Sequence, residues 1–418
     1  MDNTKRKFFP QLSSLATKGK LIAKKWLEQA KISSSRIADM ISMQWKAHTS
    51  NNLLGLDIST DSVKLLKIDL MGNQYRVENF SMAPLPANTI VKDEVKDPFA
   101  IINAIKDMIR QAEPDTKNVA VAVPRSSTIM KTITINNRLT PQEIESRAWL
   151  EANRLFPDLV GNIYLDFAIT GPAAQDPDQL EVLLVACRKE HIDPYVEILK
   201  QAGLTPRVFD VNCYALERAI PLVIPSPTQL KTIAVLNLNF TLSSFIVKHE
   251  GNLVHAHDQS YDGRHLIAQI EAREEVKEQA TEKVEAVATA ETSAPANETP
   301  AQAVAAPVTA SETPMSHPRS VTDVLRESLS SHLRHTIHFF YTSKPNITIQ
   351  KLILSGDCAN IPELPAFIQQ EVGIETVIAD PFADMLLAPG VRQESLKVHA
   401  PALMLCCGLA LSKVEKVN

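Results

Sequence analysis

Residues 52–70 read NLLGLDISTDSVKLLKIDL, in which two apolar runs flank a short polar turn. The first run contains a carboxylate near its end, Asp57, and the turn carries three hydroxyl side chains, Ser59, Thr60 and Ser62. This pattern predicts two antiparallel strands joined by a hairpin whose tip offers hydroxyls and backbone N–H groups to an anion. Asp57 is a candidate Mg²⁺ ligand acting through water, and Lys64 a candidate partner for phosphate charge. An ordinary hairpin with a polar turn fits the same residues equally well.

Two later stretches resemble a known family more closely. LEVLLVACRKE at 180–190 and AGLTPRVFDVNCYALERA at 202–219 are similar to segments of the PilM family, the actin-like proteins of type IV pilus assembly. The opening hairpin resembles the first phosphate motif of the wider actin, sugar kinase and Hsp70 superfamily, and the turn at 354–356 and the helix at 408–411 also fit. The resemblance implies an α/β, two-lobed actin-like (ribonuclease H-like) fold with an inserted 1C-type α+β subdomain.

Composition changes along the chain indicate how it is divided. Residues 271–318 are rich in Ala, Glu, Thr and Pro and have few large apolar side chains, which predicts a disordered acidic insertion. Thr140-Pro141-Gln142-Glu143 is a capping box that opens a helix in the inserted subdomain. The expected units are a basic N-terminal extension at 1–50, a first lobe (1A) at 51–126 continued at 201–228, the inserted 1C-like subdomain at 127–200, and a second lobe at 229–270 and 319–412.

The N-terminal extension is strongly basic. It carries ten Lys and Arg residues against three acidic ones, and Leu15, Ile22 and Trp26 fall at helical spacing. A basic amphipathic helix binds anionic membrane surfaces, whereas a solvated tail has the same composition. Both interpretations stay open.

The resemblance implies a nucleotide cleft, but this chain departs from the usual pattern. Where the second phosphate hairpin should read Asp-x-Gly, the chain has Asn237-Leu-Asn239, and Asp357 replaces the second glycine of a Ser-Gly-Gly adenosine turn. An amide carries no charge for a metal ion, so we expect a degenerate site for ATP and Mg²⁺ without hydrolysis. The candidate nucleotide-site residues are Asp57, Ser59, Thr60, Ser62, Lys64, Asp210, Asn237, Asn239, Thr241, Gly263, Ser355 and Gly356.

Other titratable residues give weaker signals. Asp210 follows a predicted strand and is either a cleft residue or the N-cap of the next helix. Five histidines recur on a predicted strand and a predicted helix, namely His255, His257, His332, His335 and His338. Without a clear set of partner ligands, solvated or capping roles are favoured over a metal site.

Composition limits the possible functions. Aromatic residues make up only 5% of the chain, which argues against a nucleic-acid binder that stacks bases. The five cysteines form no CxxC motif, and a reducing compartment fits best. Cys187 and Cys406 lie inside apolar runs, which predicts buried reduced thiols at these two positions. No signal peptide or transmembrane run is apparent, which predicts a cytoplasmic protein.

The resemblance implies a scaffold rather than an enzyme. Members of the PilM family bind the cytoplasmic N-terminal peptide of PilN, a single-pass membrane protein, in a groove on their large and inserted domains. We therefore expect a PilN-like partner and a peripheral location at the inner membrane, with a pilus motor ATPase and self-association as further partners. The alternatives are a phosphotransferase of the sugar kinase type, which needs an intact second phosphate loop, and an FtsA-like filament former.

Overall fold

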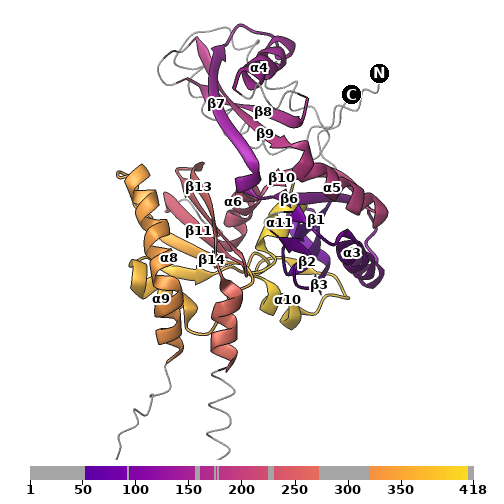
Figure 1. The fold of residues 1–418 in the computed structure, drawn as a ribbon, viewed down its shortest axis with the longest axis vertical. Coiled ribbons are helices and arrows are strands. Elements are labelled where there is room, and N and C mark those ends of the chain that lie inside the picture. Colours follow the sequence, from indigo (N-terminus) through magenta and orange to yellow (C-terminus); the bar gives the residue numbers. More distant parts are fainter. Residues whose placement is uncertain are drawn as a thin grey trace, which may run out of the picture.

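Two sheets that repeat one strand order form the body of the protein (Figure 1). The structure is a computed structural model that describes residues 52–91, 94–155, 161–173, 176, 178–224, 230–272 and 320–412. The first sheet, β10-β6-β1-β2-β3-β16, comprises Thr205–Val211, Asn118–Val123, Leu54–Ile58, Ser62–Met71, Gln74–Pro84 and Leu386–Leu387. The second, β13-β12-β11-β14-β15, comprises Asn252–Ser260, Leu242–His249, Thr232–Leu238, Lys351–Ser355 and Thr376–Ile378.

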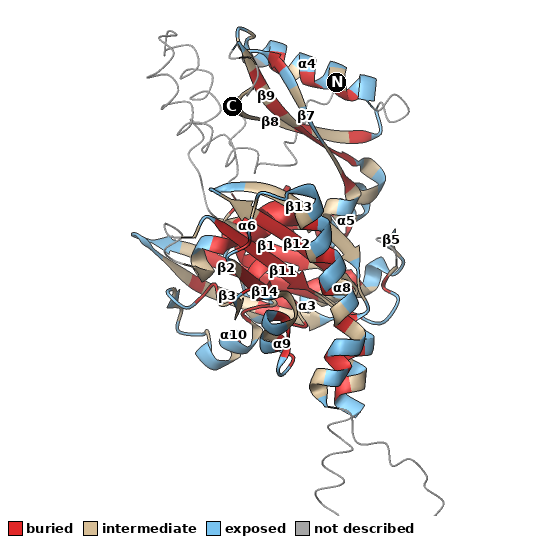
Figure 2. Cartoon of the chain, turned by 90° about the vertical axis from the view of Figure 1, so that its left-hand side faces the viewer, coloured by how far each residue is buried: buried red, intermediate tan, exposed pale blue. Residues whose placement is uncertain are grey.

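Strand pairing is the same in both sheets. β1, β2 and β3 form an antiparallel meander, and β6 and β10 then add in parallel on the other side of β1. β11, β12 and β13 form the same meander, and β14 and β15 add in parallel beside β11. The central strands β1, β11, β12 and β14 read as apolar runs because helices cover their faces, and Figure 2 shows them buried. β3 and β13 are only partly buried. The chain thus builds one α/β unit twice.

The helices divide between the two units and the inserted subdomain. Those described with both ends are α3 (Pro98–Ala112), α4 (Pro141–Leu155), α5 (Lys189–Gln201), α6 (Asn212–Val223), α8 (Val321–Ser343), α9 (Leu364–Val372), α10 (Gln393–His399) and α11 (Met404–Ala410). A further helical segment is described over 263–272. The side chain of Asp97 caps α3 by accepting from the N–H of Ala100, and Pro98 follows at the first helical position as the sequence predicts.

The inserted subdomain is a three-stranded sheet with a helix packed on one face (Figure 1). A short 3₁₀ turn, η1 (Arg125–Ser127), leads into β7 (Thr128–Asn136). The central strand of this sheet is β9 (Gln179–Arg188), which pairs with β7 on one side and with β8 (Ile163–Pro172) on the other. The predicted capping box of α4 is confirmed: Thr140 N–H donates to the Glu143 carboxylate at 2.7 Å, and Glu143 N–H donates to Thr140 Oγ1 at 3.3 Å.

Two segments pack elsewhere than the sequence suggested. α5, expected within the inserted subdomain at 127–200, contributes Ile192 and Leu199 to the core of the first lobe, where it contacts α3 and β10. The C-terminal part of 319–412, expected in the second lobe, returns to the first. Phe382 and Leu396 share an apolar cluster with residues of β2 and β3, and α11 packs against β1 and β2. The expected insertion at 271–318 and the extension at 1–50 lie outside the described residues, apart from 271 and 272.

Very close backbone contacts hold α11 in place. A Cβ added at Gly55 on β1 would lie 2.1 Å from the carbonyl oxygen of Cys406, and one at Gly408 would lie 1.9 Å from that of Ala215. No side chain larger than hydrogen fits either position. The glycine of the opening motif is therefore explained by the packing of a helix on the sheet.

Substitution at Gly408 should test this contact. We expect Gly408→Ala to lower the free energy of unfolding by about 1–3 kcal/mol or more, because the methyl group forces α11 away from α6. Gly390→Ala is the matched control, since a Cβ there meets nothing within 4 Å. Urea unfolding of both variants measures the difference, and equal stabilities would contradict the proposed close contact.

The cysteines and the helices of the described residues bear on two further expectations. All five cysteines are buried and free, which confirms the burial predicted for Cys187 and Cys406. Among the residues described, no helix is both long and apolar enough to cross a membrane.

Candidate functional site

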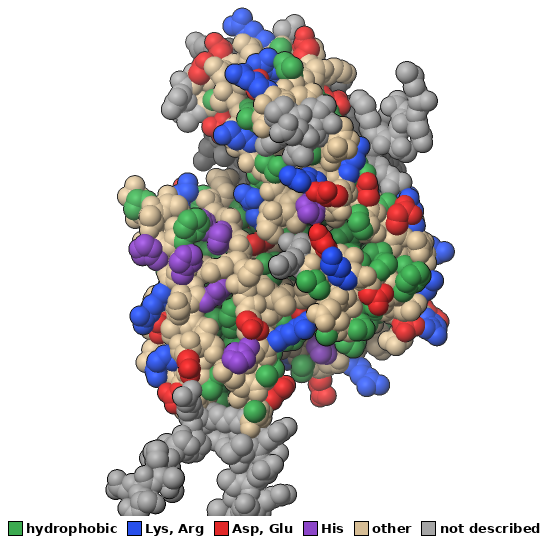
Figure 3. All heavy atoms as spheres, viewed as in Figure 1, with side chains coloured by type: hydrophobic (Ala, Val, Ile, Leu, Met, Phe, Trp, Pro, Cys, Tyr) green, Lys and Arg blue, Asp and Glu red, His purple; other side chains and the backbone are tan. Residues whose placement is uncertain are grey.

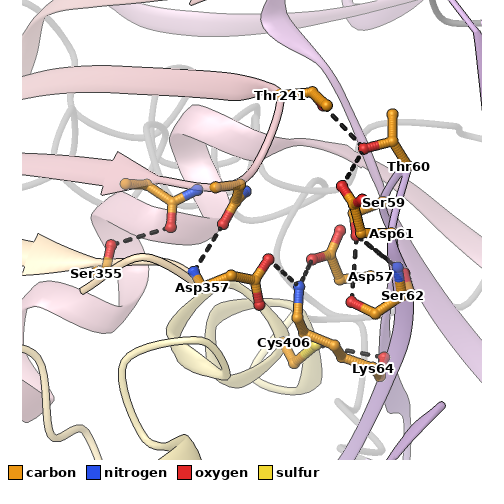
Figure 4. Close-up of polar contacts among 12 residues, drawn as sticks. Asp57, Ser59, Thr60, Asp61, Ser62, Lys64, Thr241, Ser355, Asp357 and Cys406 are labelled. Atoms are coloured by element: carbon orange, nitrogen blue, oxygen red, sulfur yellow. Dashed lines mark hydrogen bonds and ion pairs between the residues drawn. The ribbon is translucent and has the colours of Figure 1, made fainter. Parts of the chain in front are cut away.

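Two hairpins of the same geometry meet between the lobes (Figure 4). In the first, the N–H of Ser59 donates to the carbonyl of Ser62 at 2.9 Å, and in the second the N–H of Asn239 donates to that of Leu242 at 3.0 Å. The tips contact each other, with Thr60 Oγ1 2.8 Å from Thr241 Oγ1. Hydroxyls that the sequence assigned to phosphate therefore bond to one another.

Lys64 lies between carboxylates of both lobes. It stands directly opposite Asp57 in the β1–β2 register, and its Nζ lies 3.3 Å from Asp57 Oδ2. The same Nζ lies 3.0 Å from Oδ2 of Asp357, in the turn after β14 (Figure 4). The Lys64 side chain is 0% exposed, and those of the two aspartates are 9% and 7% exposed.

Burial and neighbouring charges shift the pKa values of Lys64 and Asp357. Burial alone would lower the pKa of Lys64, but Asp357 and then Asp57 raise it well above its usual range. Burial raises the pKa of Asp357, and the Lys64 ammonium opposes that shift. Lys64 thus stays charged, and two aspartates already satisfy it.

The two asparagines have structural partners. Asn237 Oδ1 accepts from Ser355 Oγ at 3.1 Å, and Asn239 Oδ1 accepts from the N–H of Asp357 at 3.2 Å. Asn237 therefore ties β11 to the end of β14, and Asn239 ties the second hairpin to the turn that follows β14. A carboxylate at either position would add another negative charge near Asp357.

The two candidate glycines are required by packing. Gly356 has φ +94°, and a Cβ there would lie 2.5 Å from the carbonyl oxygen of Leu238. A Cβ at Gly263 would lie 2.9 Å from the carbonyl oxygen of Asn239 and from Cys358 Sγ. Neither glycine needs a nucleotide to explain it.

A cavity of about 100 Å³ lies beside the hairpin tips. Its lining includes Asp57, Asn237 and Asn239 from the strand ends, with apolar walls from Ile90 and Phe209. Sites for small molecules have volumes of about 300–1,000 Å³, so this space is small for a nucleotide. No lysine or arginine lies among the described residues of the lining.

These residues do not fit ATP and Mg²⁺. A phosphate group needs a counter-charge, and Lys64 is occupied by Asp57 and Asp357. Within the part of the chain that the structure describes, no group of three or more His, Cys, Asp or Glu side chains could hold a metal ion. We derive no chemical step from this cleft.

Asp210 lies in neither of the expected places. It is fully buried, and its Oδ2 accepts from Arg218 Nη2 at 3.0 Å and from Ser412 Oγ at 3.3 Å. α6 begins at Asn212 without a side-chain cap. Arg218 also donates to the carbonyl oxygen of Gly408, so Asp210 helps to fasten α11 to the first lobe.

A second polar network between the lobes was missed from the sequence. Asp258 on β13 accepts from the N–H groups of Arg125 and Ser126 at 2.8 and 3.4 Å, and Asn212 Nδ2 donates to Asp258 Oδ2 at 3.1 Å and to Ser244 Oγ at 3.2 Å. Arg125 belongs to η1, at the base of the inserted subdomain. Nothing in the sequence links these positions, because each is an ordinary polar residue at a strand or helix end.

The histidines gather over α8 and β13 on the face shown in Figure 3. Their rings pack on aromatic side chains: His257 lies 5.0 Å from Phe339 and His255 lies 5.4 Å from Phe340, between ring centroids. Burial lowers the pKa of His255 to about 4. Burial and the neighbouring His335 lower the pKa of His332 to about 4 as well. Aromatic packing, rather than capping, accounts for His255 and His257.

Comparison with known families settles the chain's membership. The sequence pattern of the family described as "Type IV pilus assembly protein PilM" matches residues 55–294 and 302–414. The chain belongs to the PilM family. The family resemblance expected from residues 180–190 and 202–219 is thereby confirmed.

One solved structure agrees with this assignment at the level of the fold. A chain of a PilM–PilN type IV pilus biogenesis complex is 21% identical, with 87% of this chain and 99% of that chain aligned and a TM-score of 0.64. The ethanolamine utilization protein EutJ from Carboxydothermus hydrogenoformans aligns over 86% of this chain and 89% of its own, at 10% identity and a TM-score of 0.44. The two-lobed actin-like fold expected for this PilM family member is confirmed.

Asp210 generates a prediction about pH. Burial raises its pKa to about 7, although the charge of Arg218 opposes this shift. The pKa of an aspartate in the unfolded chain is about 3.9. Between these values the folded protein holds a proton that the unfolded chain has released, so the free energy of unfolding falls as pH rises. Asp210→Asn should remove about 2–3 kcal/mol of the fall between pH 5 and 8.

Urea unfolding at pH 5, 6.5 and 8 measures this effect. The matched control is Asp107→Asn on α3, whose carboxylate is 56% exposed beside Arg110. An unchanged pH dependence in Asp210→Asn would show that Asp210 is ionised throughout this range.

Proposed function

We propose that this PilM family member is a cytoplasmic scaffold of a type IV pilus assembly platform that binds the N-terminal peptide of a PilN-like membrane protein. The family match carries the proposal, since it covers nearly all of the described residues. The PilM–PilN complex supports it, because this chain aligns with almost the full length of a chain in that complex.

An apolar groove between α3 and α5 offers a place for such a peptide. Its volume is about 270 Å³, and its lining comprises Val95, Pro98, Phe99, Ile102, Pro194, Glu197, Ile198 and Gln201. Phe99 is 69% exposed, which is unusual for so large an apolar side chain. α5 follows β9 directly, so the groove adjoins the inserted subdomain. We place the apolar side chains of the peptide against Phe99.

Titration calorimetry with a synthetic N-terminal peptide of the PilN-like protein tests partner and groove separately. We expect the full chain to bind, and Phe99→Ala to raise the Kd by about tenfold or more, as truncation of a contact residue does. Phe339→Ala on α8, 45% exposed in the wild type, is the matched control. Equal Kd values for both variants would exclude the groove, and no binding by the wild type would exclude the partner.

We further propose that the protein does not hydrolyse ATP. The missing counter-charge in the cleft and the neutral Asn237 and Asn239 support this, because a phosphoryl-transfer site needs bound metal and cationic groups. The rate of phosphate release from Mg-ATP should stay far below the turnover rate of kinases, which is about 1–100 s⁻¹. A rate on that scale, retained after further purification, would favour the phosphotransferase alternative.

We propose that the protein works at the inner membrane, held by the PilN-like partner and assisted by the basic segment at 1–50. Each basic residue near an anionic surface contributes about 1 kcal/mol, which falls with salt. A pilus motor ATPase and a second copy are further candidate partners.

Membrane fractionation should compare the full chain, a chain starting at 51, and the full chain in cells without the partner. Loss of association only in the shortened chain would remove support for capture by the partner.

A further inference from the structure

Three polar contacts cross between the lobes where an actin-type fold would hold phosphate. Lys64 of the first lobe pairs with Asp357 of the second, at 3.0 Å. Thr60 and Thr241 join the hairpin tips at 2.8 Å, and Asp61 pairs with Arg264 at the start of the helical segment 263–272. The side chain of Asp61 is 14% exposed, whereas that of Arg264 is 45% exposed, so the Lys64 pair is the more deeply buried link.

We propose that the Lys64–Asp357 ion pair is an internal latch that replaces a nucleotide between the lobes. Lys64 extends from β2, and Asp357 extends from the turn after β14 (Figure 4). The Asp357 carboxylate supplies the negative charge that a phosphate group would otherwise bring to Lys64. The lobes therefore stay closed without nucleotide.

The environment of Lys64 explains why a nucleotide does not compete. An anion approaching Lys64 would meet Asp57 and Asp357, each within 3.3 Å of the ammonium. Like charges placed side by side oppose binding, and the two carboxylates already compensate the lysine. Removing Asp357 leaves Lys64 paired with Asp57 alone and removes one of the two repelling carboxylates.

Lys67 on the same strand provides a matched control. Its side chain is 2% exposed, and its ammonium pairs with Asp115 and Asp69, both in the first lobe. Asp115→Asn breaks an ion pair of a buried β2 lysine without touching the interface between the lobes. A general effect of losing a buried charge partner would appear in both variants, whereas loss of the latch appears only when Asp357 is changed.

Spin labels on the two lobes measure their separation in the full chain. Lys106→Cys on α3 and Arg326→Cys on α8 are exposed positions, and the five native cysteines are buried and thus poorly accessible to the label. In this background we expect Asp357→Asn and Asp357→Gly to broaden or lengthen the distance distribution, and Asp115→Asn to leave it unchanged. Mg-ATP should not change the distribution of the otherwise wild-type protein.

Binding of a fluorescent ATP analogue gives a second measurement. Asp357→Gly restores the Ser-Gly-Gly turn, and we expect it to strengthen binding by about tenfold or more, because the repelling carboxylate is gone. Asp357→Asn keeps the size of the side chain and serves if the glycine variant does not fold.

Two results of the distance measurement would overturn the latch. A distance distribution in Asp357→Asn identical to that of the wild type would show that the pair does not hold the lobes. A clear closure of the wild-type protein on adding Mg-ATP would show that nucleotide still sets their separation. Neither measurement uses the peptide partner, so the latch and the scaffold proposal fail independently.

Discussion

A buried ammonium group requires a counter-charge, and this requirement organises the centre of the protein. Lys64 is 0% exposed, and its charge is balanced by Asp57 across the strand pair and by Asp357 from the other lobe. Taking an ion out of water costs several kcal/mol unless partners compensate it. Separating the lobes would expose or unbalance this group, so the relative position of the two sheets depends on it.

The chain keeps the frame of a nucleotide-binding fold while its site has changed. Both hairpins retain the same closing hydrogen bond, from Ser59 N–H and from Asn239 N–H. Gly356 is fixed by its positive φ and by the nearby carbonyl of Leu238, which are properties of the backbone. The differences from the usual pattern lie in side chains of the site, namely Asn237 and Asn239 in the second hairpin and Asp357 in the turn after β14. This is in line with the rule that function resides in side chains placed on a common fold.

The sequence predicted local structure well and long-range packing poorly. The two apolar runs around the polar turn predicted the hairpin. Its register, which the structure shows, places Lys64 opposite Asp57. The sequence placed 127–200 in the inserted subdomain, but it did not show that α5 packs on the first lobe. The Lys64–Asp357 pair joins positions 293 residues apart, and each half of it looks like an ordinary charged residue in the sequence. For Asp210, neither neighbouring motif indicated the partner Arg218 on the following helix.

The network around Asp258 connects lobe closure to the inserted subdomain. Asp258 belongs to the second lobe, yet it accepts from backbone N–H groups of Arg125 and Ser126 in η1. η1 is followed at once by β7, the strand through which the chain enters the inserted subdomain. Because Asn212 binds the same carboxylate from the first lobe, the three bodies meet at one partly buried point. A movement of one lobe against the other would therefore be transmitted to the base of β7, so the geometry at the inserted subdomain depends on the lobes remaining closed.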